Sequence, residues 1–213
     1  MSHQVLRHCK PLGTGLGADL AAMRDVVPRR VRITAPPDNV CLTLRVPSTF
    51  DALTKHQLDA LVHYGDSFTF DSFTTTDAYE LGHLLHARLF AEPRPALISI
   101  SLTNGLTLFQ ATTGTGVNPD NEVWVQRKRR SVLRWGTSTW MLHCKYKGDE
   151  AAFAAKNGLG GEAGLYAIHG GAVPIRVQGV EGVVAVVVVS GLKQHEDHGV
   201  IVDVVRENWE PVA

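Results

Sequence analysis

The stretch from residue 167 to 204 limits the fold of this chain more than any other part of its sequence. Its first feature is the glycine pair Gly170 and Gly171, which has the backbone freedom that a tight turn needs. Pro174 follows in a segment where its missing N–H is tolerated at a sheet edge or at the start of a strand. The pattern predicts two short extended segments, 167–169 and 172–177, that meet at the glycine turn.

The second half of this stretch predicts a buried strand followed by a helix. Residues 183–189 are apolar throughout and mostly β-branched, which is typical of a strand covered on both faces. Gly191 ends that strand, and apolar residues then recur at helical spacing from Val200. Glu196 and Asp197 fall in the first turn of this helix, where carboxylates complement the helix dipole. We interpret the acidic pair as capping residues and not as catalytic groups.

Four motifs in this chain resemble those of one known family. They are GGAVPI at 170–175, VVSG at 188–191, QHEDH at 194–198 and PDNEVWVQRKRRSVLRW at 119–135. Together they resemble the HbpS and GlcG-like superfamily, also called the haem-degrading domain family, and in particular its cytosolic branch. The resemblance extends from about Phe68 to Trp209. It implies a profilin-like antiparallel β-sheet flanked by helices in α/β/α layers, in subunits that assemble into rings or other symmetric homo-oligomers.

The order of local patterns independently favours an α+β fold. A helix with a leucine stripe is predicted after Thr76 or Asp77, which can cap it, and Pro93 stops it. Two strands then flank Asn104-Gly105, a dipeptide that is a strong hairpin signal. Helices are expected from Pro119, over 138–146 and over 149–156, before the chain returns to the sheet. Strand pairs joined by short turns predict a mainly antiparallel sheet and not a doubly wound parallel one.

The domain organisation predicted from the sequence is one main domain with an N-terminal addition. Residues 1–37 mix glycine and proline at intervals that interrupt regular structure, so an irregular arm is expected there. Residues 38–213 are expected to form a single HbpS/GlcG-like domain, with 38–67 as an extension packed on it. Within the extension, 40–46 alternates as a strand does and 51–64 has helical spacing.

Charge and cysteine content narrow the partners and the compartment. The 21 basic and 21 acidic residues balance, so bulk charge does not favour nucleic acid or an anionic membrane as a partner. The apolar run at 183–189 is too short to cross a bilayer. Three widely spaced cysteines and an N-terminus without a continuous apolar segment predict a cytoplasmic protein.

The basic helix contains the sharpest local charge feature. On a helix, Trp124, Lys128, Ser131 and Trp135 share one face, next to Arg127. This face can bind an anionic planar ligand through its aromatic groups and its cation. Alternatively, the tryptophans pack into the core or a subunit interface, where tryptophan and arginine are enriched. We favour the second interpretation over ligand binding, and both over nucleic-acid binding.

His169 is the candidate ligand-binding histidine. It directly precedes Gly170 and Gly171, and a histidine beside flexible backbone at a pocket can ligate haem or act as a base. The alternative is an imidazole held by nearby backbone carbonyls. The resemblance implies a ligand site formed by His169, the glycine pair, Trp124 and the basic helix, with Arg127 or Lys128 binding haem propionates. Haem is thus the candidate cofactor.

The other motifs indicate neither a metal site nor a catalytic nucleophile. Glu80, His83 and His86 share a helix face, but no HExxH motif or cysteine cluster accompanies them, so no metal site is predicted. No nucleophile motif is present, and Cys144 beside His143 cannot form a dyad on a helix. The sequence therefore predicts an oligomeric small-ligand-binding protein, or else a non-enzymatic scaffold that recruits protein partners. If the chain is an enzyme, the resemblance implies a haem-degrading activity.

Overall fold

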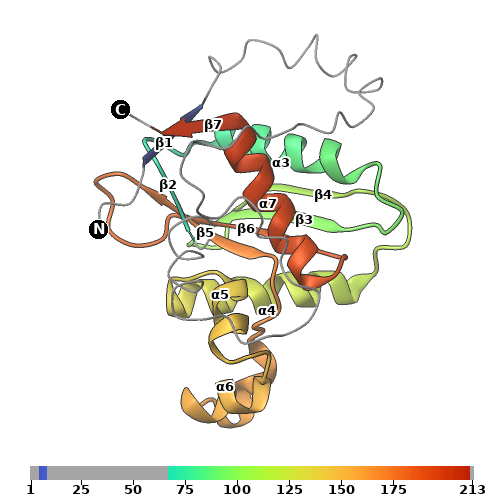
Figure 1. The fold of residues 1–213 in the computed structure, drawn as a ribbon, viewed down its shortest axis with the longest axis vertical. Helices are drawn as coiled ribbons and strands as arrows, with labels where there is room; N and C mark the ends of the chain where they lie inside the picture. The colour runs from blue at the N-terminus through green and yellow to red at the C-terminus, as the bar shows by residue number, and fades with distance from the viewer. Residues whose placement is uncertain (1–4, 9–66, 212–213) are drawn as a thin grey trace, which may run out of the picture.

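A seven-stranded sheet lies at the centre of the protein, in the strand order β4-β3-β6-β5-β2-β1-β7. The computed structural model describes residues 5–8 and 67–211 (Figure 1). The antiparallel part pairs β4 with β3, β3 with β6, and β6 with β5, while β2 pairs parallel with β5 and with β1. The strands are β1 (Val5–His8), β2 (Phe68–Phe70), β3 (Leu97–Leu102), β4 (Thr107–Thr112), β5 (Ala172–Val177), β6 (Ala185–Ser190) and β7 (Trp209–Pro211).

Helices cover both faces of the sheet, which gives three α/β/α layers (Figure 1). The larger apolar cluster joins one sheet face to α3 and α7, and a smaller one joins the other face to α4. The predicted α+β class with a profilin-like, mainly antiparallel sheet is confirmed. The helices are α3 (Thr75–Leu89), α4 (Pro119–Trp135), α5 (Thr139–Lys145), α6 (Glu150–Lys156), the 3-10 helix η2 (Gly160–Leu165) and α7 (Gln194–Asn208).

Helix ends follow local side-chain chemistry. The N-cap of α3 is Thr74, two residues before the predicted Thr76, and Asp77 completes a capping box with it. Pro119 occupies the first turn of α4, and Gly136 ends that helix in the left-handed conformation, with a φ of 66°. The predicted β3–β4 hairpin is confirmed, with Gly105 at a φ of 96° in its turn.

The predicted hairpin around the glycine pair is wrong. Residues 167–169 form no strand, and β5 instead pairs with β6 across a turn at 178–184. Side chains of α4 bind the backbone of residues 166 and 167 in place of a strand. The Ala167 N–H donates to Ser131 Oγ at 3.0 Å, and Tyr166 O accepts from the Arg127 guanidinium at 3.0 Å. The segment is thereby held as a loop at the end of the sheet.

The structure tests only part of the predictions for the N-terminal region. Val5–His8 form β1, which pairs with β2 and β7, so the predicted irregular arm contains a strand that sequence patterns did not indicate. The predicted strand at 40–46 and helix at 51–64 lie outside the described residues. Among the residues described, no helix has the length and apolar character required to span a bilayer.

Candidate functional site

A cavity of about 300 Å³ lies where the end of β6 meets α4 and the first turn of α7. Its volume is at the lower limit of small-molecule pockets, which range from about 300 to 1,000 Å³. The cavity is lined by residues from three separate parts of the sequence, namely α4, the loop at His169 and residues 190–197. The lining residues are Asn121, Trp124, Lys128, His169, Ser190, Gly191, Leu192, Gln194 and Asp197.

A buried ion pair joins two elements at the cavity. Lys128 on α4 places its Nζ 3.0 Å from Asp197 Oδ2 on α7, and the same Nζ donates to Val189 O at 3.0 Å. The two side chains are only 4% and 3% exposed. Burial lowers the pKa of Lys128 and raises the pKa of Asp197, while the attraction between the two charges acts in the opposite direction on each. The cavity therefore contains a desolvated cation and anion in direct contact.

Two backbone segments, one at Leu192 and one at Gly170 and Gly171, pack closely around this ion pair. The second Asp197 oxygen, Oδ1, accepts from the Leu192 N–H at 2.9 Å. Gly171 has a φ of 112°, and a Cβ on it would lie 2.7 Å from Asp197 Cβ and 2.8 Å from Lys128 Nζ. A Cβ on Gly170 would lie 2.3 Å from Gln194 O. Both glycines are therefore needed where the loop passes the ion pair, because any larger residue would collide with it or with α7.

His169 and Trp124 form the aromatic part of the cavity lining. Their rings meet edge to face with centroids 4.8 Å apart. Glu150 Oε1 on α6 lies 3.3 Å from His169 Nδ1, although this contact lacks hydrogen-bond geometry. Burial has the largest effect on the pKa of His169 and lowers it. The charge of Glu150 raises this pKa, and the charge of Lys128 lowers it. The imidazole is therefore mainly neutral near pH 7.

Arg127 lies outside the cavity lining. Its guanidinium is 4.4 Å from the centre of the Trp124 ring and donates to Tyr166 O. The side chain thus supports Trp124 and the loop before His169 from behind. The five other predicted ligand residues gather at this site, with three in the lining and the glycine pair packed against it.

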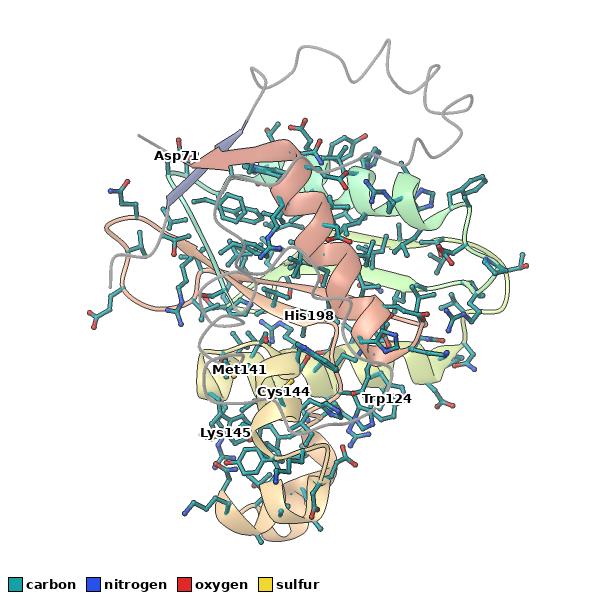
Figure 2. All side chains as sticks on the ribbon, in the orientation of Figure 1. Asp71, Trp124, Met141, Cys144, Lys145 and His198 are labelled. Carbon is teal, nitrogen blue, oxygen red and sulfur yellow. The ribbon has the colours of Figure 1, made fainter. Side chains whose placement is uncertain are left out.

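A second layer of aromatic and histidine side chains lies next to the cavity. His143 stacks on Trp140 at 5.1 Å, and Gln194 links His143 Nε2, at 3.2 Å, to the Gly170 N–H, at 3.4 Å. The His198 ring also lies against Trp140, with centroids 6.1 Å apart, and Figure 2 shows His198 on α7. Burial lowers the pKa of His143 to about 4 and that of His198 to about 3.

Sequence patterns missed several residues of the site. Asp197 was expected only to cap α7, and Asn121, Ser190 and Gln194 had no predicted role. The sequence signal that could have located the site was Lys128. It shares a helix face with Ser131, and the structure shows that Ser131 is fully buried. A lysine on a buried face requires an anionic partner.

Other candidate sites have no comparable geometry. His83 lies against Tyr79 and Phe109, with ring centroids 4.1 Å and 5.4 Å away, and His86 Nε2 contacts Thr112 O. Within residues 5–8 and 67–211, no group of three or more His, Cys, Asp or Glu side chains is placed to hold a metal ion. The cavity beside Lys128 is therefore the candidate site.

Comparison with known proteins identifies the family. The model of the family described as "Haem degrading protein HbpS-like" matches residues 73–206. This chain belongs to the HbpS-like family. The match runs from α3 through β6 and includes most of α7, so it contains every residue that lines the cavity. It confirms the resemblance inferred from the sequence motifs.

Relatives of this HbpS-like protein occur in bacteria and yeast. A UPF0303 protein of Streptomyces avermitilis is 39% identical over 140 residues, which cover 65% of this chain and 82% of that protein. One of Brucella anthropi is 34% identical over 162 residues, covering 75% of this chain and 93% of that protein. The crystal structure of the Ybr137w protein matches with a TM-score of 0.61 and 33% identity, over 70% of this chain and 84% of that one.

Proposed function

We propose that this protein binds a small ligand in the cavity beside Lys128 and Asp197, as a cytoplasmic homo-oligomer. The observation that carries the proposal is the combination of groups in one cavity: a buried ion pair, an indole and an imidazole. Pockets for small molecules typically combine apolar and aromatic walls with a few polar groups that fix orientation. Desolvation makes the ion pair a strong local field for a polar ligand.

The ligand class that we propose is a haem-like or other anionic planar molecule. Trp124 and His169 offer ring surfaces to a planar group, and Lys128 offers a cation. The family description makes haem the first ligand to test. Because the cavity has a volume of only about 300 Å³, it fits the edge of a macrocycle or a smaller planar molecule, and not an enclosed haem.

A haem titration with matched variants tests this proposal. The full-length protein is titrated with haem and followed by the Soret band, together with His169→Ala and the control His195→Ala. His195 lies on α7 but does not line the cavity. We expect saturable binding that is weakened at least tenfold by His169→Ala and unchanged by His195→Ala, because an imidazole in the lining contributes contacts worth more than about 1.4 kcal/mol. Equal binding by both variants would place haem elsewhere on the protein.

Native mass spectrometry tests the oligomer and any retained ligand together. Freshly purified, untagged protein is expected as a closed oligomer that carries a stoichiometric extra mass. An oligomer without extra mass that also fails to bind added haem would contradict the haem-like ligand class. A monomer would contradict the oligomeric part of the proposal.

An oligomeric scaffold that recruits protein partners is the second candidate function. Its support is the sheet edge formed by β4, which pairs only with β3 among the described strands. Leu106, just before β4, is 58% exposed and Phe90 is 70% exposed. Open strand edges and exposed apolar side chains are typical of association surfaces. An oligomer without any small ligand in the mass spectrum would favour this function.

A further inference from the structure

We infer that Lys128 reacts covalently with a ligand carbonyl group, forming an imine with a small aldehyde or ketone bound in the cavity. Asp197 is the group that accepts and returns the proton. This inference rests on the proposed function, because it requires that a ligand enters the same cavity. It adds a reaction at a named atom and a chemical class of ligand that binding alone does not require.

The position of the Lys128 ammonium is the first observation. An ammonium has three N–H donors, and two of those on Nζ are used by Asp197 Oδ2 and Val189 O, both at 3.0 Å. Gly171 closes one side of Nζ, because even a Cβ at that residue would be 2.8 Å away. Lys128 also lines the cavity. A ligand oxygen in the cavity is therefore the available acceptor for the third N–H.

Neighbouring donors are largely occupied within the protein. The Leu192 N–H donates to Asp197, the Lys193 N–H donates to Glu196, and the Asn121 amide donates to Ser190 O at 3.3 Å. The Gln194 side chain bridges Gly170 and His143. These backbone and amide groups are therefore used within the protein, and the Lys128 amine is the charged donor that faces the cavity. A carbonyl compound matches a single buried amine.

The pKa shifts of Lys128 and Asp197 also favour the proton transfer that imine formation requires. Burial lowers the pKa of Lys128 and raises that of Asp197, and both shifts ease proton transfer from the ammonium to the carboxylate. Buried lysines of this kind serve as Schiff-base nucleophiles in other proteins. Stability alone does not explain a buried ion pair at this position, since apolar residues of similar volume are often at least as stabilising.

The reaction balances without an oxidant or reductant. The ammonium gives a proton to Asp197, and the neutral amine then attacks the carbonyl carbon, so that a C–N bond forms. The carbonyl oxygen takes the proton back from Asp197 and becomes a hydroxyl group. The nitrogen then gives a second proton to Asp197, which passes it to that hydroxyl. Water leaves as the nitrogen lone pair forms the C=N bond, and the product is a protonated imine next to the Asp197 carboxylate.

Reductive trapping tests this inference on the full-length protein. Pyruvate and propanal serve as separate probes, each with sodium cyanoborohydride, and adducts are located by peptide mass spectrometry. We expect the adduct at Lys128 to form faster than at the exposed Lys145, Lys147 and Lys156, since burial lowers the pKa of Lys128 and so raises its neutral fraction. Labelling that is no faster at Lys128 than at the exposed lysines would overturn the inference.

Three variants separate the reaction from folding and from binding. Lys128→Arg keeps a cation beside Asp197 and should lose the fast-labelled peptide, whereas Lys156→Arg should keep it. Asp197→Asn should slow the labelling at Lys128, because the proton acceptor is lost; labelling at an unchanged rate contradicts its role. Native mass spectrometry is run in parallel without the reductant. A retained ligand with no adduct at Lys128 would overturn the imine but leave the proposed binding function intact.

Discussion

The two faces of the sheet have opposite chemistry, although the same strands form both. Toward α3 and α7, Ile98 and Ile100 of β3 are fully buried in a large apolar cluster. Toward α4, Ser99 and Ser101 from the same strand are almost as buried, and Ser101 accepts from Arg129 at 2.8 Å. Successive residues of a strand point to opposite faces, so one strand serves both layers.

This difference separates the source of stability from the place where chemistry is available. The apolar face joins α3 and α7 to the sheet through close packing. The α4 face has fewer buried apolar residues and instead contains Lys128, Ser131 and Thr139. Buried polar groups are acceptable only where they are bonded, so this face requires specific partners. We infer that the site combines the polar groups of the α4 face with Asp197 from the first turn of α7, at some cost in stability.

The largest expected effect comes from breaking the ion pair that joins Lys128 on α4 to Asp197 on α7. Asp197→Ala should lower the free energy of unfolding by about 4 kcal/mol, because it leaves the Lys128 ammonium buried without its anion. Urea denaturation at neutral pH measures this loss. This loss of stability should become smaller as the pH is raised toward the usual lysine pKa, because Lys128 then loses its proton in the unfolded chain as well as in the folded variant.

A double variant provides the control for the ion pair. Lys128→Met combined with Asp197→Leu should recover most of the stability, since apolar replacements of buried pairs are often neutral or stabilising. The same variant should lose ligand binding. If it stays as unstable as Asp197→Ala, then the pair stabilises the fold, and the contrast between the two faces is weaker than we propose.

The next largest effect is expected on the apolar face. Leu85→Ala on α3 should cost about 3 kcal/mol, because Leu85 is fully buried and its truncation leaves a cavity in the larger cluster. Ligand binding should be unchanged at a temperature where the variant is folded. Phe90→Ala, at 70% exposure, is the matched control and should stay within about 0.5 kcal/mol of the parent. Weaker binding in folded Leu85→Ala would show that the two faces are coupled.

Much of the fold could be predicted because its signals are local. The Asn104-Gly105 turn, the leucine stripe of α3 and the apolar run of β6 each depend on a few consecutive residues. The loop at 166–169 could not be predicted in this way, since its backbone partners are Ser131 and Arg127, more than thirty residues away. Short extended segments look alike in sequence whether they pair or not.

The site was predictable only in part for the same reason. Trp124 and Lys128 are four residues apart on one helix, so their shared face follows from helical spacing. The pairing of Lys128 with Asp197 joins residues 69 positions apart. No periodicity within either helix indicates that contact, and the position of Asp197 in a first helical turn has a sufficient local explanation in capping. Only the three-dimensional arrangement assigns it to the cavity.

The smallest effect distinguishes the histidines beside the cavity from the apolar core. His198 is buried with neither ring nitrogen bonded to a described residue, and burial lowers its pKa to about 3. The unfolded chain protonates this histidine near pH 6.5, so the stability it contributes is complete above that pH and falls as the pH drops toward 3. Arg206 and Lys128 lower the pKa in the same direction.

Between pH 6.5 and 5, His198→Phe should reduce the slope of unfolding free energy against pH by up to about 1.4 kcal/mol per unit. Urea denaturation at several pH values measures this slope, and His195→Phe on the same helix is the control that should leave it unchanged. At pH 7.5 the His198 variant should be as stable as the parent or more so, because phenylalanine has no polar atom to leave unbonded. An unchanged slope would mean that His198 is protonated in the folded protein, and a third buried charge would then lie close to Lys128 and Asp197.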